Sequence, residues 1–327
     1  MLKYLIRRLL NYAFLTLLAT TIAYMVSSWL MDPRARYQGR NPPIPEATID
    51  SILSANGINN HDPVLARTWA WLVRIFTDGS FGRDIAGNEI TSAIAERASV
   101  SLRLLIVGSL LGALLGVILG VWGAVRQYKF SDQVVTYISY VLISTPTFVA
   151  GVIIMILATR FNNAMGRQVI RFAGEYTPGL PDDFWTQFSD RLVHMLLPTT
   201  ILILFGAAVY SRYQRSIMLD VLGSDYIRTA RAKGATRSRA LVKHGVRVAL
   251  IPMSTYFAYS FGTLLSGATF LEIVFSWNGM GRYTINAIIN QDINAAVASV
   301  AFAAVLVLFS SMLSEILYAA LDPRVRV

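Results

Sequence analysis

The chain contains no cysteine and little charge, since only 15% of its 327 residues are Asp, Glu, Lys or Arg. Without cysteine, a disulfide framework and a thiolate metal site are both excluded. Soluble globular domains carry about 25% charged residues, whereas 54% of this chain is hydrophobic and its mean hydropathy is +0.50. These values exclude a disordered chain and an ordinary soluble enzyme. They indicate a polytopic membrane protein.

The sequence also lacks the motifs of common catalytic sites. It contains no Gly-x-Ser-x-Gly elbow, no His-Glu-x-x-His pair and no Gly-x4-Gly-Lys-Ser/Thr phosphate loop. Its three histidines, His61, His194 and His244, are scattered without the spacing of metal ligands, so we interpret them as interfacial or structural. We therefore predict a non-catalytic chain that binds no metal and no cofactor. If it works against a gradient with nucleotide, another chain must bind that nucleotide.

Long apolar stretches account for the high hydropathy. A helix that crosses a bilayer needs about 20 predominantly apolar residues. Six stretches reach or approach that length: 9–31, 104–125, 134–159, 193–211, 248–270 and 293–314. The sequence therefore predicts an all-α integral membrane protein with six transmembrane helices. The first stretch has the basic start of a signal peptide, but it is longer than a typical h-region and no clear cleavage site precedes Asp32, so we interpret it as a membrane anchor.

The distribution of Lys and Arg predicts the orientation of these helices. With the N-terminus inside, the inner segments hold 16 of the 29 cations and five of the 19 acids, whereas the outer segments hold 13 cations and 14 acids. The positive-inside rule then places both termini in the cytoplasm of a plasma (inner) membrane protein. The net charge of +10 reflects this arrangement and not nucleic acid binding, because the surplus cations form no readable face on a soluble domain.

Loop lengths suggest three parts. They are an N-terminal transmembrane helix (1–31), an extracytoplasmic segment (32–97) and a five-helix core (98–327) whose large internal loop spans 212–247. The extracytoplasmic segment is predicted to be either a small folded cap or amphipathic helices lying on the membrane. Its Trp69 and Trp71, and Trp277 further on, could contact an incoming ligand, although anchoring at the membrane interface is the commoner role.

Four glycines recur at four-residue spacing in the second stretch: Gly108, Gly112, Gly116 and Gly120. In a helix they lie along one side, where they let the backbone of another helix approach closely. We interpret them as a packing surface within the subunit. The alternative is a seam along which helices slide during transport.

Prolines and isolated acids are the other unusual features of the spans. Pro146 and Pro198 each remove an internal hydrogen bond, and such positions are either hinges that line a path or purely structural kinks. Glu272 and Glu315 lie near span ends, and no series of acids or histidines crosses the middle, which argues against an ion-driven carrier. The candidates for a translocation path or gate are Pro146, Pro198, Glu272 and Trp277.

The internal loop predicts two short helices. Ser224 is a plausible N-cap, Asp225 suits the positive end of a helix dipole, and Gly234 is expected to end the first helix. A second helix is expected to begin around 236–238 and to continue into the fifth span. The cations of this helix–Gly–helix unit could attract lipid headgroups. One side of the unit, however, is small enough to seat in a groove of another protein. That side consists of Ala230, Ala232, Gly234 and Ala235.

This loop resembles the coupling segment of ATP-binding-cassette importer permeases, specifically the dipeptide/oligopeptide branch. The matching residues are Asp225-Tyr226-Ile227-Arg228-Thr229-Ala230-Arg231-Ala232-Lys233-Gly234, then His244 ten residues later, then Leu250-Ile251-Pro252. The resemblance extends over nearly the whole chain. It includes the start at 4–10, which is similar to the first (B-type) permease of such systems, and the segments 78–83, 272–282 and 318–324.

The chain departs from the pattern of that branch at a few positions. Gly245 and Val248 replace the usual Ala and Asn after the histidine, which is expected to loosen the second coupling helix. Asn278 and Met280 stand where Pro and Leu are usual. These changes weaken the transfer of substrate detail but not the assignment to the branch.

The resemblance implies a type I ABC importer permease fold and an alternating-access mechanism. Its partners would be a second homologous permease, two cytoplasmic ATP-binding subunits that hold ATP and Mg, an extracytoplasmic peptide-binding protein and a peptide substrate. The residues that it implies for ATPase coupling are Asp225, Tyr226, Arg228, Thr229, Ala230, Arg231, Ala232, Lys233, Gly234 and His244. The branch also includes transporters of nickel complexes and glutathione, so the substrate stays open. An ion-driven carrier would need ionisable residues in mid-span, and a scaffold or receptor would need no coupling loop.

Overall fold

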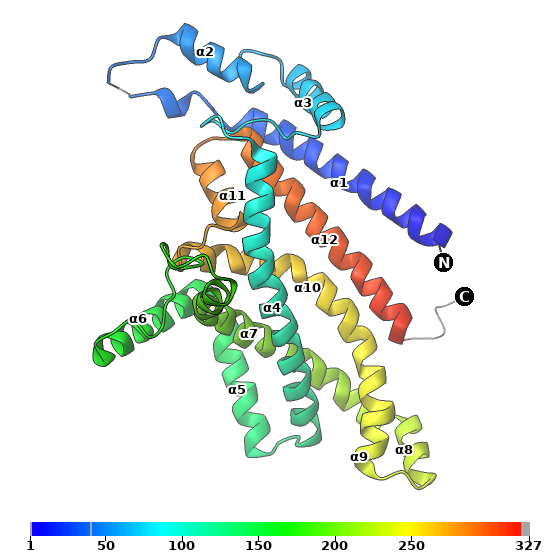
Figure 1. Cartoon of the computed structure of the whole chain (residues 1–327). Coiled ribbons are helices and arrows are strands. Elements are labelled where there is room, and N and C mark those ends of the chain that lie inside the picture. The colour runs from blue at the N-terminus through cyan, green and yellow to red at the C-terminus, as the bar shows by residue number, and fades with distance from the viewer. Residues whose placement is uncertain (1, 40, 322–327) are drawn as a thin grey trace. The chain divides into compact units, whose positions relative to one another are not determined.

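The computed structural model describes the backbone of residues 2–39 and 41–321, and most side chains within those ranges. The regular structure of this part of the chain is helical, which confirms the all-α prediction (Figure 1). The elements are α1 (Leu2–Leu30), η1 (Ala35–Tyr37), α2 (Glu46–Ala55), α3 (Val64–Asp78), α4 (Ile90–Val125), α5 (Phe130–Ser144), α6 (Thr147–Met165), α7 (Phe184–Gly223), α8 (Asp225–Ala232), α9 (Arg237–Ala240), η2 (Leu241–Val246), α10 (Arg247–Val274), α11 (Met280–Ile289) and α12 (Ile293–Leu321).

Several of these helices are long enough to cross a bilayer. Five segments of the described chain qualify by length and composition: Ile6–Leu30, Ile90–Val125, Thr147–Met165, Phe184–Gly223 and Ile293–Tyr318. Helix α10 occupies the position of the predicted fifth span and has 28 residues, more than the roughly 20 that a crossing requires. Together with α10, long helices occupy five of the six predicted positions, and α6 occupies only part of the third, 134–159.

The third predicted span, 134–159, is not one helix, and this part of the prediction is wrong. Helix α5 ends at Ser144 and α6 begins at Thr147. Between them Thr145 is extended, with φ −97° and ψ 128°. The ring of Pro146 disfavours a helical conformation at the residue before it, and proline donates no backbone hydrogen bond. The two helices therefore run in different directions from this break (Figure 1).

The described residues divide into two compact units. The first comprises the residues up to Ser101 together with Asn278–Leu308, and the second comprises Leu102–Trp277 together with the residues from Phe309 onward. Helices α4 and α12 each contribute to both units. The three-part division made from the sequence stays a prediction.

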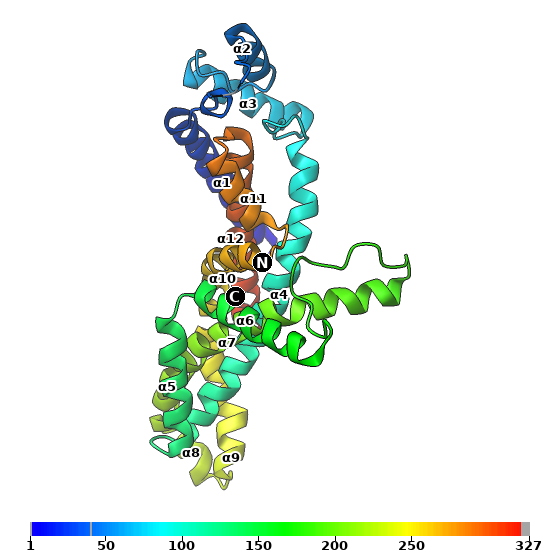
Figure 2. The same cartoon turned by 90° about the vertical axis from the view of Figure 1, so that its left-hand side faces the viewer.

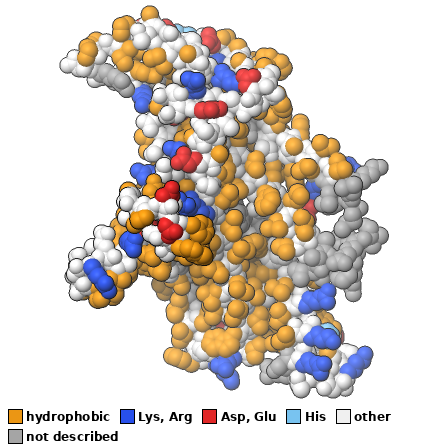
Figure 3. Space-filling model, in the orientation of Figure 1, with side chains coloured by type: hydrophobic (Ala, Val, Ile, Leu, Met, Phe, Trp, Pro, Cys, Tyr) orange, Lys and Arg blue, Asp and Glu red, His pale blue; other side chains and the backbone are white. Residues whose placement is uncertain are grey.

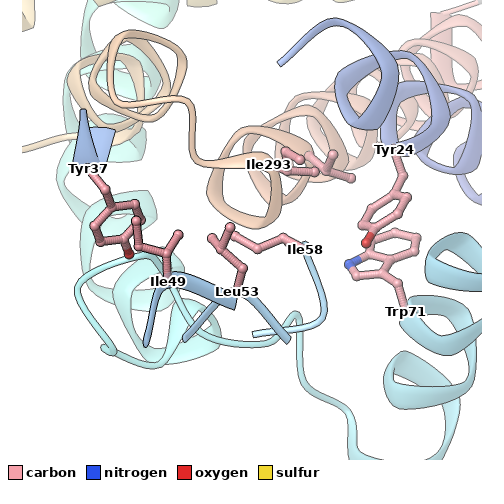
Figure 4. Close-up of a cluster of buried hydrophobic side chains, with 8 residues drawn as sticks. Tyr24, Tyr37, Ile49, Leu53, Ile58, Trp71 and Ile293 are labelled. Atoms are coloured by element: carbon pink, nitrogen blue, oxygen red, sulfur yellow. The ribbon is translucent and has the colours of Figure 1, made fainter. Parts of the chain in front are cut away.

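In the first unit, segment 32–97 shares a hydrophobic core with α1 and α12. Tyr24 of α1 stacks on Trp71 of α3 with ring centroids 4.8 Å apart, and both side chains are buried (Figure 4). The other members of this cluster are Tyr37, Ile49, Leu53, Ile58, Ile293 and Val297. Polar contacts add to it: Asn294 donates from Nδ2 to the carbonyl of Asn56 at 3.0 Å. Helices α2 and α3 are thus packed against α1 and the start of α12.

The second unit is organised around α7. This 40-residue helix packs against α5, α6 and α10, and its buried face includes small residues such as Gly206, Ala207 and Ala208. Figure 2 shows α8 and α9 at one end of this unit, beyond the end of α7 and before the start of α10. The long helix therefore leads directly to the segment that the sequence analysis singled out.

Candidate functional site

Helix α8 follows α7 with one residue between them. That residue, Ser224, is the N-cap of α8 and has an extended backbone, as predicted, but its side chain accepts no hydrogen bond from α8, and its hydroxyl donates to the carbonyl of Val221. Asp225 occupies the first turn, where its carboxylate suits the helix dipole. Gly234 has a φ of +87°, a left-handed conformation that glycine adopts without strain. The helical segment therefore ends next to Gly234, as predicted.

One apolar side chain anchors α8 to the rest of the second unit. Ile227 is 5% exposed and lies in a buried cluster with side chains from four other elements. The other members are Ala124 of α4, Met218 and Val221 of α7, Leu241 of η2 and Ala249 of α10. This cluster therefore packs α8 against both α7 and α10.

The second coupling helix contains a wider turn than expected. Arg237–Ala240 is α-helical, but Leu241–Val246 is a π-helix, and the chain then continues as α10. A Cβ atom at Gly245 would lie 3.1 Å from Cε of Met218 and 3.2 Å from Cγ1 of Val221. Whether Gly245 loosens this helix stays a prediction. The missing side chain lets η2 pack closely against α7.

The outer side of α8 forms a shallow groove of about 460 Å³ with the start of the following helix. Its lining includes Tyr226, Thr229, Ala230, Lys233, Gly234 and His244. Arg228 points away from the cluster, with 75% of its side chain exposed, and its ion pair with Asp225 at 3.5 Å is too exposed to be strong. The structure thus brings the predicted coupling residues together on one short helix and its flank.

This groove lies in a basic region. Residues 226–247 contain seven Lys or Arg residues and no Asp or Glu. In Figure 3 blue side chains gather at α8 and α9, while hydrophobic side chains cover the visible face of α4 and α5. A partner that binds here would be complementary in charge if it offered acidic groups.

The four glycines of α4 lie against α7. A Cβ at Gly108 would be 2.6 Å from Cβ of Leu202, and one at Gly120 would be 2.6 Å from the carbonyl oxygen of Ser211. Gly112 meets the backbone of α7 at Gly206, and Gly116 meets Tyr210 and the carbonyl of Ala207. Neither helix has room for larger side chains along this line. Whether the contact slides during transport stays open.

On another side of α7, an ion pair ties it to α5. Arg215 donates from Nε to Oδ1 of Asp132 at 2.7 Å and from Nη2 to Oδ2 at 2.8 Å. The backbone N–H of Tyr128 donates to the same carboxylate at 3.0 Å. Only 3% of the Asp132 side chain is exposed, against 26% of Arg215. The hydrogen bonds from Arg215 hold the pKa of the Asp132 carboxyl below its usual value.

The predicted path or gate residues lie at several places in the second unit. Pro146 is at the break between α5 and α6, and Pro198 is buried inside α7. Glu272 and Trp277 are close together, because the N–H of Trp277 donates to the carbonyl of Glu272 at 2.7 Å, and both side chains are buried. A role for any of the four in a gate stays a prediction.

Sequence reasoning missed a buried polar network between α7 and the loop before it. Asp190 accepts hydrogen bonds from Arg171, from the N–H of Thr177 at 2.6 Å and from the hydroxyl of Thr177 at 2.8 Å. His194, one turn further along α7, contacts the same hydroxyl at 3.1 Å and the carbonyl of Gly174 at 3.0 Å. This network fits the structural role expected of His194. The spacing of Asp190 and His194, four residues apart on one helix face, is the signal that could have suggested it.

Comparison with known proteins shows the family to which the chain belongs. A family described as "Binding-protein-dependent transport system inner membrane component" matches residues 112–327, which include α8 and its groove. The chain belongs to this family. Membership makes it a multi-pass membrane protein that serves transport and not catalysis.

Relatives resemble the chain over all or part of its length. The oligopeptide transport system permease protein OppB of Mycobacterium tuberculosis is 46% identical over 327 residues, covering 100% of both chains. The oligopeptide transport system permease protein AppB of Bacillus subtilis is 32% identical over 290 residues, 87% of each. The dipeptide transport system permease protein DppB of Escherichia coli is 42% identical over 139 residues, 42% of this chain and 41% of that one.

Proposed function

We propose that this chain is the permease subunit of an ATP-driven importer that takes up oligopeptides or dipeptides by alternating access. The names of its relatives support peptides as the substrate class. The partners would be a second permease, two ATPase subunits that bind ATP and Mg in the cytoplasm, and an extracytoplasmic peptide-binding protein. Both termini of the chain would lie in the cytoplasm.

The observation that carries this proposal is that α8 has two different sides, one buried in the permease and one open to a partner. One side holds Ile227 in the cluster shared with α7 and α10, and the other presents Ala230 and Gly234 in a basic groove. A short helix of this kind can seat in a cleft of a moving ATPase and pull both long helices with it. ATP and loaded binding protein would then each bias one equilibrium between inward-open and outward-open states.

The coupling role of α8 predicts that ATP hydrolysis and uptake can be separated by mutation. In the complete importer in liposomes, Ala230→Trp fills the groove and Gly234→Pro removes the residue that adopts φ +87°. We expect peptide uptake to fall by about tenfold or more while the ATPase subunits retain hydrolysis, since the loss concerns docking and not the nucleotide site. The measurement is the number of peptides imported per ATP hydrolysed.

The control is Val242→Trp, which introduces the same side chain at a 67% exposed position outside the groove lining. It should leave uptake per ATP unchanged. Undiminished uptake in the Ala230 and Gly234 variants would contradict the coupling role. The partners themselves are tested by purification from native membranes in mild detergent: recovery of the chain alone, without ATP-binding subunits, would contradict the importer.

A further inference from the structure

Helix α3 has an apolar side that its own unit leaves uncovered. One side of the helix is packed, with Trp71 2% exposed, Arg67 5% and Thr68 6%. The other carries a stripe, which we call the α3 stripe, consisting of Leu65, Trp69, Val73 and Phe76. Its two aromatic members are 69% and 71% exposed. The spacing of four, four and three residues keeps these side chains on one helix face.

Contacts with α1 fix where α3 lies along that helix. The Tyr24–Trp71 stack is six residues before Leu30, the last residue of the candidate span, and Arg67 donates from Nη2 to the carbonyl of Ser28, two residues before it. At 1.5 Å per residue these contacts lie about 9 Å and about 3 Å inside the end of the span. Figure 4 shows the stacked pair between the two helices. Helix α3 therefore lies beside the last turns of α1 and not beyond them.

The same portion of α1 is itself apolar and exposed. Ile22, Val26 and Trp29 are 52%, 45% and 80% exposed, as expected for a helix that faces lipid. Polar groups begin at this level as well, because a groove of about 500 Å³ brings Trp29 and Leu30 next to His61 and Asp62. The apolar stripe and the apolar face of α1 thus meet polar residues where the hydrocarbon gives way to headgroups.

We infer that the α3 stripe is a membrane-contact surface, covered by phospholipid at the boundary between headgroups and acyl chains. Amphipathic helices at this boundary bury their apolar face by about 5–10 Å, which matches the depth that the contacts with α1 set. Tryptophan is also enriched at this level. Under the proposed orientation the leaflet is the outer one. Apart from the choice of leaflet, the inference depends only on α1 crossing the bilayer and not on peptide transport.

The absence of cysteine from the whole chain makes a direct test possible. In the complete importer in phospholipid liposomes, Leu65→Cys and Phe76→Cys each place one thiol of this chain on the α3 stripe. The matched control is Ser51→Cys, at an exposed position on α2 of the same unit. Labelling with a water-soluble maleimide measures access to water, and quenching of a thiol-attached fluorophore by doxyl-labelled lipids measures contact with acyl chains.

We expect the two stripe thiols to react about tenfold more slowly than Cys at position 51, and only their fluorophores to be quenched by lipid. Equal labelling rates without quenching would mean that water covers the stripe and would overturn the inference. Slow labelling without lipid quenching would mean that another protein covers it, and would also overturn it. Two separate stripe variants are used so that the test still stands if one of the substitutions disturbs folding. Failure of peptide uptake would not affect either readout, so the two proposals fail separately.

Discussion

Helix α7 is held by two contacts of opposite character. Toward α4 the contact is made by the glycines of that helix, so close that Cα of Gly206 lies 3.4 Å from the position of a Cβ at Gly112. Toward α5 the contact is polar. It consists of the Asp132–Arg215 ion pair and of a second contact, between the hydroxyls of Ser139 and Ser211 at 3.4 Å. Steric contact between backbones permits little change in spacing, whereas hydrogen bonds can break and form again.

The difference suggests separate tasks for the two sides of α7. We expect the α4–α7 pair to move as one element, because the glycines of α4 leave no side chains between its backbone and the surface of α7. Helix α5 is fastened near its start by Asp132, and it ends at the break before Pro146. It can therefore follow α7 through one charged contact while its other end turns independently of α6. Mutations on the two sides should differ in both size and kind.

The largest effect is expected from filling the glycine side. In Gly120→Leu the new side chain meets the carbonyl oxygen of Ser211, only 2.6 Å from the position of its Cβ, so the two helices must separate. Overpacking of this kind costs roughly 1–3 kcal/mol or more, so we expect a lower unfolding temperature and loss of monodisperse protein. Thermal unfolding followed by size-exclusion chromatography measures both.

Gly223→Leu is the control for that change. Gly223 also lies in a helix, at the end of α7, but no atom lies within 4 Å of its Cβ position. Its variant should keep the unfolding temperature of the unmodified chain. If the Gly120 variant were equally stable, the α4–α7 contact would have to be more deformable than its distances indicate, which would favour the sliding seam.

A smaller effect, and one of a different kind, is expected from Asp132→Asn. The amide keeps the shape of the carboxylate but removes its charge, leaving Arg215 without its bidentate partner. Arg215 is a quarter exposed and can recover some hydration, so we expect a loss of about 1–2 kcal/mol rather than the larger penalty of a fully buried charge. The pair links α5 to the helix that leads to α8. We therefore expect peptide uptake per ATP to fall even where the protein stays folded.

Exchanging the charges provides the control for this second change. The double variant Asp132→Arg with Arg215→Asp restores an ion pair of opposite direction, and it should recover part of the uptake per ATP that either single variant loses. A double-mutant cycle in the reconstituted importer measures that recovery. Additive losses would show that the two side chains act independently and would contradict the coupling between α5 and α7.

Much of the helical arrangement could be predicted from the sequence. Apolar length located five spans and α10, and glycine ended the helical segment of α8 near Gly234. The break at Pro146 was missed because the apolar run continues on both sides of it, and hydropathy does not register backbone conformation. A proline within a span is compatible with a kink as well as with a complete break, and packing decides between them.

Pairings between distant residues were beyond the reach of the sequence. Asp132 and Arg215 are 83 residues apart, and only the packing of α5 on α7 brings them together. The anchoring of Ile227 depends in the same way on its contact with Met218. It also depends on the space beside both side chains that is free because residue 245 is glycine. The coupling motif identified the residues of α8, but not which of them face inward, because an eight-residue helix offers too few positions for a periodic pattern.

The smallest effect is expected from titration of the same carboxyl. Arg215 lowers the pKa of Asp132 in the folded protein below its usual value of 3.8. The stability that the pair contributes is therefore fully present above that value, and it is lost as the pH falls through the lower, folded-state pKa. Thermal unfolding between pH 6 and pH 3 should show this loss in the unmodified chain, and a shallower dependence in Asp132→Asn. The atoms nearest to a Cβ at Gly108 all belong to Leu202, which does not titrate, so Gly108→Ala should leave the slope unchanged. Equal slopes for the unmodified chain and Asp132→Asn would mean that the ion pair adds no stability, and that the α5 side of α7, like the α4 side, depends on packing alone.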